Sequence, residues 1–299
     1  MICSLNPFRD KYKKEGGKRM QFHRILEERK SVREFRDKSL SKEHIYALQE
    51  SFYKSQKLIQ DLNVDFHFLA DGNRAHEALL GYAGYHGRAI EAPHYMVITS
   101  EKKEGYLINA GYIMEQILLK AYELEIGSCW IDVLEEMDAL RNKLNMEDPK
   151  DIVAMAALGY PKKNIFGIET SVSDRESIED LVFLERWGQP MELDILNQRG
   201  LGEIFYYVRH APSWGNIQPW RFILDNDKLV LIMLNDEKYG KGDSIDKEHD
   251  LDCGIIMLYI EKMMHKKGIR GKWSLDLNIL YKDRYNIPKN SEIKGYFPI

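Results

Sequence analysis

Three polar side chains near the start of the chain have a spacing that suits phosphate. Arg29, Ser31 and Arg33 alternate within the segment ERKSVREF, so in an extended backbone their side chains share one face. Two guanidinium groups and a hydroxyl on one face can bind phosphate, because the fork of arginine donors matches its oxygens. A solvated, charged helix end has the same spacing, and on spacing alone that interpretation is favoured.

A second polar stretch, APSWGNIQPW, occupies residues 211–220 between a predicted helix and a predicted strand. Pro212 ends the helix, and Ser213 and Asn216 place short polar groups on the turn. Such a loop can present backbone amides and an asparagine amide to a flat heteroaromatic ring. Proline, serine, glycine and asparagine are also common in ordinary turns, and composition alone favours that simpler interpretation.

Other stretches carry weaker signals. GLG at 200–202 lacks the third glycine and the preceding strand of a dinucleotide-binding fingerprint. The acidic stretch DSIDKEHD at 243–250 is predicted to be a solvated loop before a helix, because a metal site needs ligands that converge. Cys129 and Cys253 fall at core-like positions and are expected to be buried. We predict no metal site and assign no catalytic acid, base or nucleophile.

The composition predicts a folded globular protein. The chain has 299 residues, 44% of them hydrophobic and 11% aromatic, which suffices for one large domain or two lobes. The formal charge is −4 with basic residues dispersed, so we expect no nucleic-acid partner. The apolar run at 254–260 is too short to span a bilayer, so we expect no membrane partner. Three scattered cysteines without a CxxC pair indicate reduced thiols and predict a cytoplasmic location.

Residues 1–19 are polar and lack the apolar core of a secretory signal. We expect a flexible lead-in. A second hypothesis is that Met20 is the native start, since KEGGK can be encoded by a purine-rich run that resembles a bacterial ribosome-binding site.

The elements that must position these side chains alternate between helix and strand, which is typical of an α+β (α/β) protein. Helices are predicted over 20–29, 40–61, 105–127 and 193–210, and a helix followed by a strand is predicted over 250–273. Further strands are predicted over 64–71, 92–100, 220–226 and 228–236, and at the end of 146–161.

Two of these helices share a pattern that indicates an internal repeat. Gly111 is followed by Met114 and, nineteen residues after the glycine, by Trp130; Gly254 is followed in the same way by Met257 and Trp273. The glycines would allow two helices to approach closely. We therefore predict two related lobes, at 20–185 and 186–299.

Four pieces of the chain resemble the FMN-dependent nitroreductase family. They are RKSVREF at 29–35, NAGYIMEQILLKAYELEIGSCWI at 109–131, AALGYPKK at 156–163 and APSWGNIQPWRF at 211–222. The R-x-S-x-R and P-S-x-x-N-x-Q-P-W elements are the more specific ones. Members of this family are homodimers with FMN at the subunit interface, and the P-S-x-x-N loop comes from the other subunit.

In this chain each predicted lobe carries only part of such a site. The first lobe has R-x-S-x-R and L-G-Y-P, but KLIQDLNVDF stands where its own loop would be. The second lobe has the loop but no R-x-S-x-R. The resemblance therefore implies a nitroreductase-like fold in which two lobes of one chain mimic the homodimer, with one flavin site and a monomeric state.

The resemblance also implies which residues contact FMN. Those at the phosphate and ribityl chain would be Arg29, Lys30, Ser31 and Arg33, with Arg175 as a late basic residue at the phosphate. Those along the flavin would be Leu158 and Gly159 from the first lobe and Pro212, Ser213, Trp214 and Asn216 from the second. Trp214 departs from the family, which usually has a small residue at this position.

The implied activity is an NAD(P)H-dependent reduction of a nitroaromatic, quinone or similar small acceptor, by ping-pong hydride transfer through flavin N5. Two alternatives remain open. One is a non-enzymatic flavin-binding redox sensor or carrier, which Trp214 over the ring would favour. The other is a relative of the flavin-cleaving oxygenases, which would need a polar group near the flavin.

Overall fold

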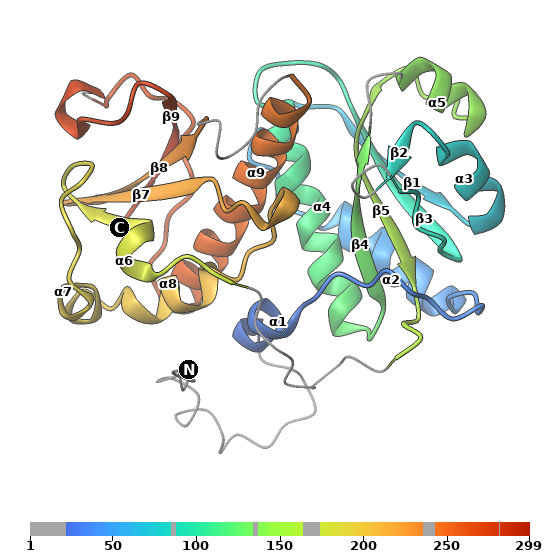
Figure 1. Cartoon of the computed structure of the whole chain (residues 1–299), viewed down its shortest axis with the longest axis horizontal. Coiled ribbons are helices and arrows are strands. Elements are labelled where there is room, and N and C mark those ends of the chain that lie inside the picture. Colours follow the sequence, from blue (N-terminus) through green and yellow to red (C-terminus); the bar gives the residue numbers. More distant parts are fainter. Residues whose placement is uncertain (1–21, 85–87, 134–136, 164–173, 236–242, 281) are drawn as a thin grey trace.

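Two β-sheets lie on either side of a pair of crossed helices, α4 (Tyr106–Glu123) and α9 (Asp243–Lys266) (Figure 1). The computed structural model describes residues 22–84, 88–133, 137–163, 174–235, 243–280 and 282–299. The expectations for residues 1–19 and for Met20 therefore lie outside the described residues. The predicted mixture of helix and sheet is confirmed.

The first sheet has five strands in the order β1-β3-β5-β4-β2, and each neighbouring pair is antiparallel. Its strands are β1 (Val64–Leu69), β2 (Ala83–Gly84), β3 (His94–Ser100), β4 (Gly127–Val133) and β5 (Asp151–Gly159). The helices beside it are α2 (Lys42–Tyr53), α3 (Gly72–Leu79) and α5 (Met137–Lys143) (Figure 1). Strands β3 and β5 are buried almost end to end, so they form the centre of this layer.

The second sheet has four strands in the order β6-β7-β8-β9, of which only β6 and β7 run parallel. Its strands are β6 (Val182–Leu184), β7 (Trp220–Asp225), β8 (Lys228–Leu234) and β9 (Ser291–Pro298). The short helices near it are α6 (Ile178–Leu181), α7 (Leu193–Gln198) and α8 (Gly202–Val208), with 3-10 turns η2 (Trp214–Asn216) and η4 (Lys282–Tyr285). Because β6 belongs to this sheet, the second sheet begins before residue 186, the predicted start of the second lobe.

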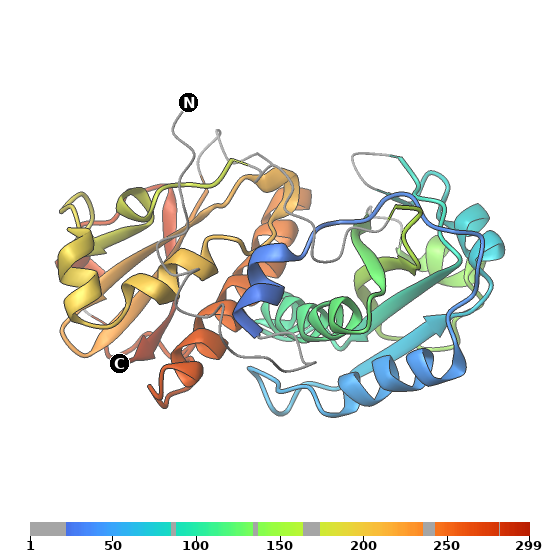
Figure 2. The same cartoon turned by 90° about the horizontal axis from the view of Figure 1, so that it is seen from below.

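The two central helices lie side by side (Figure 2). They touch at a pair of glycines. A Cβ on Gly111 would lie 2.1 Å from the carbonyl oxygen of Leu251, and a Cβ on Gly254 would lie 1.9 Å from that of Ile108. Each contacted carbonyl belongs to the residue three places before the opposite glycine, so the contact is reciprocal. Only a hydrogen side chain fits at either place, and the predicted close approach of these helices is confirmed.

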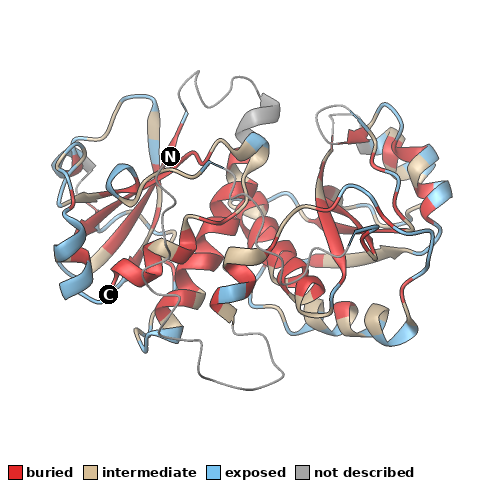
Figure 3. Ribbon diagram, turned by 60° about the horizontal axis from the view of Figure 1, so that its bottom comes forward, coloured by how far each residue is buried: buried red, intermediate tan, exposed pale blue. Residues whose placement is uncertain are grey.

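Burial concentrates on the crossed helices and on the strands of both sheets (Figure 3). Cys129 and Cys253 are both buried, as predicted.

The helix predicted over 40–61 ends at Tyr53. Beyond it the chain turns, and the backbone N–H groups of Leu58 and Ile59 donate to Asn109 Oδ1 at 2.9 and 3.1 Å. A buried amide on α4 thus satisfies backbone donors that a longer helix would have paired internally.

Three further predictions about elements are wrong. The single helix over 193–210 is two helices, α7 and α8, broken at Gly200, whose φ of 74° does not fit a right-handed helix. The stretch 243–250 forms the first turns of α9 rather than a loop, and Glu248 and His249 in it are buried. The strand expected within 250–273 does not form; nearby, Ser274 makes only an isolated bridge with Tyr296.

Candidate functional site

The segment that contains the R-x-S-x-R pattern runs extended beside strand β4. The N–H of Val32 donates to the carbonyl of Ser128 at 2.8 Å, and Ser31 forms a parallel bridge with Ser128. Val32 is buried in the core, whereas Ser31 is half-buried and Arg33 is exposed. The predicted alternation is therefore present, with the polar side chains on the face opposite Val32.

The same segment continues along the turn that follows β5. The N–H of Arg36 donates to the carbonyl of Tyr160 at 2.8 Å, and the N–H of Lys162 donates to the carbonyl of Glu34 at 3.0 Å. The fold therefore brings the R-x-S-x-R segment and the L-G-Y-P turn side by side.

Leu158 and Gly159 form the buried end of β5. A Cβ on Gly159 would lie 2.6 Å from the ring of Pro93 and 2.9 Å from the ring of Phe35. The space beside this glycine is filled by the protein itself, so its missing side chain serves packing between the turn and its neighbours.

The loop at 211–218 has an unusual backbone. Gly215, Asn216 and Gln218 have φ angles of 56°, 59° and 53°, in the left-handed region that a glutamine in particular avoids. The Asn216 amide donates to the carbonyl of Asp174 at 2.9 Å, which ties the loop to the stretch before α6.

Trp214, in the middle of this loop, is held by two carboxylates from different elements. Its backbone N–H donates to Asp252 of α9, with 3.2 and 3.1 Å to the two oxygens. Its indole Nε1 donates to Asp132 Oδ2 of β4 at 2.8 Å. Within the loop, the N–H of Gln218 donates to Ser213 Oγ at 2.9 Å.

Arg175 lies against the same loop. Its Nη1 donates to the carbonyl of Ala211 at 2.8 Å. The next residue, Glu176, donates its backbone N–H to Gln218 Oε1 at 3.0 Å. The buried amide of Gln218 therefore fixes the segment that presents the Arg175 guanidinium.

Four basic side chains gather at this place: Arg29, Arg175, Arg209 and His210. Burial, together with the charges of Arg29 and Arg209, lowers the pKa of Arg175 to about 10. Burial and the charges of Arg175 and Arg209 lower the pKa of His210 to about 3, so this imidazole is neutral near pH 7.

Within the part of the chain that the structure describes, four buried atoms of this cluster have no hydrogen-bond partner: Arg29 Nε, which lies 3.2 Å from Glu115 Oε1 as an ion pair, Arg175 Nε, Arg209 Nε and His210 Nε2. Buried polar atoms without partners carry a substantial desolvation cost, and clustered cations repel one another. A bound anion such as phosphate would supply both the missing hydrogen-bond acceptors and the missing negative charge.

Arg29 differs from the other cations because a buried carboxylate faces it. Its Nε lies 3.2 Å from Glu115 Oε1, and its Nη2 donates to Oε2 at 3.4 Å. Trp130 Nε1 and the Tyr259 hydroxyl also donate to Glu115, at 2.9 and 3.1 Å. Burial raises the pKa of the Glu115 carboxyl, and these three partners act against it. Glu115 of α4 thus joins a strand of the first sheet, a residue of α9 and Arg29.

The structure brings most of the predicted site residues to one region. Arg29 and Arg175 meet in the basic cluster, Ser31 and Arg33 follow β4, and Pro212 and Ser213 begin the loop that Trp214 and Asn216 continue. Lys30 is only partly buried, and burial lowers the pKa of its amine.

Sequence reasoning missed six residues of this region: Glu115, Asp132, Arg209, His210, Gln218 and Asp252. Two signals were available. Arg209 and His210 directly precede APSWGNIQPW, and Glu115 is a charge within the nearly all-apolar stretch NAGYIMEQILL.

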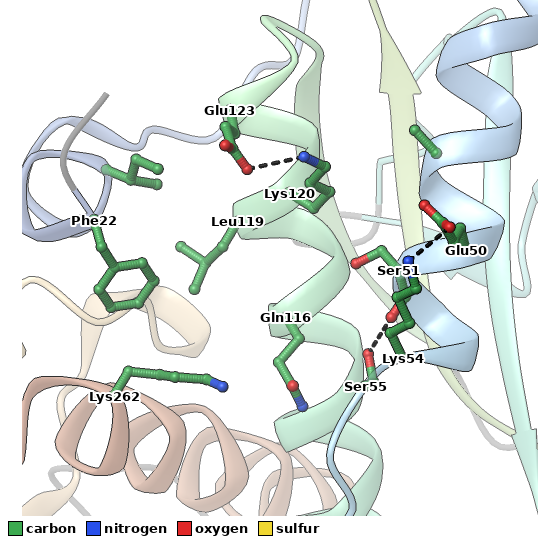
Figure 4. Close-up of a pocket in the computed structure, with 12 residues that line it drawn as sticks. Phe22, Glu50, Ser51, Lys54, Ser55, Gln116, Leu119, Lys120, Glu123 and Lys262 are labelled. Carbon is green, nitrogen blue, oxygen red and sulfur yellow. Dashed lines mark hydrogen bonds and ion pairs between the residues drawn. The ribbon is translucent and has the colours of Figure 1, made fainter. Parts of the chain in front are cut away.

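A cavity of about 420 Å³ lies elsewhere, among α1 (Phe22–Glu28), α2, α4 and α9 (Figure 4). Its walls carry two ion pairs, Lys54–Glu50 at 2.7 Å and Lys120–Glu123 at 3.0 Å. Its lining includes none of the residues that we predicted for the flavin.

Among the described residues, no group of three or more histidine, cysteine, aspartate or glutamate side chains is arranged to hold a metal ion. None of the helices in the described ranges has both the length and the apolar character needed to cross a membrane.

A family model described as "Putative TM nitroreductase" matches residues 22–264. A solved structure described as a "putative nitroreductase" from Thermotoga maritima covers 95% of this chain and 96% of its own, with a TM-score of 0.56 and 17% identity. The two proteins thus share a fold over nearly their whole length.

Two smaller structures match part of the chain. A nitroreductase with bound FMN from Bacteroides fragilis covers 52% of this chain and 95% of its own, with a TM-score of 0.43 and 18% identity. A nitroreductase family protein from Clostridium novyi covers 57% and 97%, with a TM-score of 0.43 and 17% identity. No curated protein matches the chain.

Proposed function

The chain belongs to the nitroreductase family that its residues 22–264 match, and from this premise we propose that it is an FMN-dependent oxidoreductase. In this proposal NADH or NADPH reduces the bound flavin, and the flavin then reduces a small acceptor such as a nitroaromatic or a quinone. FMN supplies the redox chemistry, and the protein binds and orients it.

The buried basic cluster is the observation that carries this proposal. Arg175, Arg209 and His210 have buried polar atoms without partners among the described residues, and Arg29 lies beside them. A phosphate monoester is the part of FMN that such a cluster fits, since it offers several oxygens and nearly two negative charges.

Each part of the site has a separate role in this proposal. Arg29, Arg175, Arg209 and His210 would bind the phosphate. Glu115 would keep the Arg29 guanidinium in place, because the carboxylate already pairs with one side of it. The loop from Pro212 to Asn216 and the segment from Lys30 to Arg33 would lie along the rest of the cofactor.

We also propose that the chain is a fused, asymmetric counterpart of a homodimer. The reciprocal contact of Gly111 and Gly254 supports this, because identical surfaces related by a two-fold axis make contacts of that kind. Two residues before these glycines stand Asn109 and Asp252. Asn109 accepts two backbone N–H groups from one loop, and Asp252 accepts one from another. The surface that would form the interface of a homodimer is thus buried within one chain, and the protein would be a monomer.

We call the first sheet with α4 the first half and the second sheet with α9 the second half. The two halves differ at the position four residues after these glycines, and this difference supports a single flavin site. Glu115 pairs with Arg29 in the first half, whereas Leu258 occupies the corresponding position of α9 and is buried in the core. A cytoplasmic location is part of the proposal and agrees with two buried thiols, Cys129 and Cys253, that form no disulfide.

Flavin titration tests the binding part of the proposal. We expect the purified protein to bind one FMN per chain and to behave as a monomer by light scattering. Arg175→Met should weaken FMN binding at least about tenfold, since it removes charge-assisted hydrogen bonds to phosphate. Arg199→Met is the matched control, because Arg199 is an exposed arginine whose side chain donates to the carbonyl of Asn226. A protein that takes up no FMN would overturn the proposal.

Anaerobic reduction tests the enzymatic part. We expect the yellow protein to be bleached by NADH or NADPH and reoxidised by a nitroaromatic or a quinone. A flavoprotein that neither nicotinamide reduces would be a redox sensor or carrier instead. Consumption of the flavin itself under oxygen would indicate a flavin-cleaving oxygenase.

A further inference from the structure

The residue that departs most from the family pattern, Trp214, is also the one with the most unusual anchors. Both of its N–H groups donate to carboxylates, the backbone N–H to Asp252 and the indole Nε1 to Asp132. Asp252 belongs to α9 of the second half, and Asp132 belongs to β4 of the first. This one residue therefore connects the loop to both halves, by its backbone to the second and by its side chain to the first.

Comparison with the loop at 54–59 of the first half separates the backbone anchor that both loops have from the indole bond that only Trp214 makes. Leu58 and Ile59 donate their backbone N–H groups to Asn109, just as Trp214 donates its own to Asp252. Asn109 and Asp252 both stand two residues before a crossing glycine, so the backbone anchor is common to both loops. The indole bond to Asp132 has no counterpart at Leu58 or Ile59, whose side chains carry no polar hydrogen.

The backbone of the second loop explains why another anchor is useful. Asn216 and Gln218 have positive φ angles, a backbone conformation that residues with a side chain rarely adopt. A strained conformation persists only where surrounding contacts determine it. Trp214 lies two residues before Asn216, so an anchor at Trp214 directly restricts the backbone of the strained residues that follow.

We infer that Trp214 is a positioning residue, which fixes the 211–218 loop of the second half against strand β4 of the first by means of its indole N–H bond to Asp132. The functional side of this inference rests on the proposed function, because this loop is the part of the flavin site that the second half supplies. Trp214 then acts on the flavin indirectly, by holding Ser213 and Asn216 in the conformation that binds it.

Hydrogen exchange tests the anchor without reference to the cofactor. In the protein as purified and after flavin removal, Trp214→Phe and Asp132→Ala should each accelerate exchange at least about tenfold in peptides covering 211–218. Peptides of strand β7 and of the loop at 54–59 should keep their exchange rates. Asp132→Ala leaves the loop sequence intact, so its effect cannot come from an altered loop. Unchanged exchange in both variants would overturn the inference.

FMN affinity then measures what the anchor does. Trp214→Phe and Asp132→Ala should each raise the FMN dissociation constant about tenfold, and the double variant should bind as either single variant does. Asp132→Asn should stay within about threefold of the wild type, because its amide oxygen still accepts the indole N–H. Additive losses, or equal losses for Asp132→Asn and Asp132→Ala, would mean that no such bond positions the loop.

The two measurements separate the anchor from the proposed function. If exchange accelerates as expected but the wild type binds no FMN, the anchor stands and the flavin proposal fails. If the wild type binds FMN and neither variant changes exchange or affinity, the flavin proposal stands and the anchor fails.

Discussion

The loops that approach the two central helices are anchored alike but equipped differently. Asn109 of α4 holds the loop at 54–59, and Asp252 of α9 holds the loop at 211–218. Only the second loop has positive φ angles, at Gly215, Asn216 and Gln218. Each loop has a side-chain bond to the opposite half: Gln56 Oε1 accepts from Lys262 Nζ of α9 at 3.1 Å, and Trp214 Nε1 donates to Asp132 of β4. A shared scaffold position can therefore support a simple turn in one half and a strained loop in the other.

The interior beside each helix shows the same contrast. Glu115 is fully buried, and it pairs with Arg29 and accepts from the partly buried Trp130 and from Tyr259. At the corresponding position of α9, Leu258 packs in the apolar core. A buried carboxylate is tolerated where a cation and hydrogen-bond donors surround it, and this condition is met in one half only.

The largest expected effect comes from making the two halves alike. Leu258→Glu would bury a carboxylate without the arginine that Glu115 has, and it should lower the free energy of unfolding by about 3–5 kcal/mol. Leu258→Met is the control and should cost less than about 1.5 kcal/mol, since it keeps volume and polarity. Urea unfolding measures both. Equal stability of the two variants would show that the second half also accommodates a buried charge.

The glycine crossing provides the next largest effect. Gly111→Ala and Gly254→Ala should each cost about 1–3 kcal/mol, because the new methyl group would overlap a carbonyl oxygen of the opposite helix. The two costs should be similar, since the contact is reciprocal. Gly188→Ala is the reference: nothing lies within 4 Å of its Cβ position, and its φ of 78° adds only about 1 kcal/mol of strain. If Gly254→Ala were as stable as the wild type, the helices would not be packed as closely as described.

The features that sequence predicted are those set by short-range patterns. The alternation around Ser31 survives in the structure because Val32 needs the core and its neighbours do not. The crossing of Gly111 and Gly254 could be predicted because only glycine leaves room for a backbone contact. The apolar periodicity over 193–210 misled for a related reason: α7 and α8 both face the core, and the break at Gly200 leaves that pattern intact.

The features that sequence missed depend on which distant residues meet. Asp252 is a charged residue in a helix, and nothing local shows that burial raises its pKa well above the usual range or that Trp214 donates to it. Nothing local shows that Arg175 lies close enough to Arg209 for the charge of Arg209 to lower the pKa of Arg175. Helices α3 and α5 were missed because they are short and lack a long apolar stripe.

Removal of the first anchor tests whether the two loops are independent. Asn109→Ala would leave the N–H groups of Leu58 and Ile59 without their acceptor and should cost about 1–2 kcal/mol in unfolding free energy. Hydrogen exchange should accelerate at 54–59, and the FMN dissociation constant should stay within about twofold of the wild type. Weaker FMN binding in this variant would mean that the first loop also contributes to the flavin site.

The smallest effect near neutral pH concerns two buried histidines. His210 belongs to the basic cluster, and His23 lies outside it and serves as the comparison. Burial, with the neighbouring arginines, lowers the pKa of His210 to about 3, and burial, with Lys266, lowers that of His23 to about 4. Well above pH 6.5, the ordinary pKa of histidine, both are neutral whether the chain is folded or unfolded, so they add no pH dependence there. As the pH falls below 6.5, the unfolded chain binds protons that the folded protein rejects, and stability is lost progressively toward those lower pKa values.

His210→Gln and His23→Gln should therefore each reduce the loss of unfolding free energy between pH 7 and about pH 5. The two histidines should differ once FMN is present. A phosphate beside His210 would favour its charged form and raise its pKa, so FMN should relieve the acid sensitivity due to His210 and leave that due to His23 unchanged. Unfolding measured at both pH values, with and without FMN, makes the comparison. Equal relief for both histidines would place the phosphate away from His210, and the basic cluster would then need another ligand.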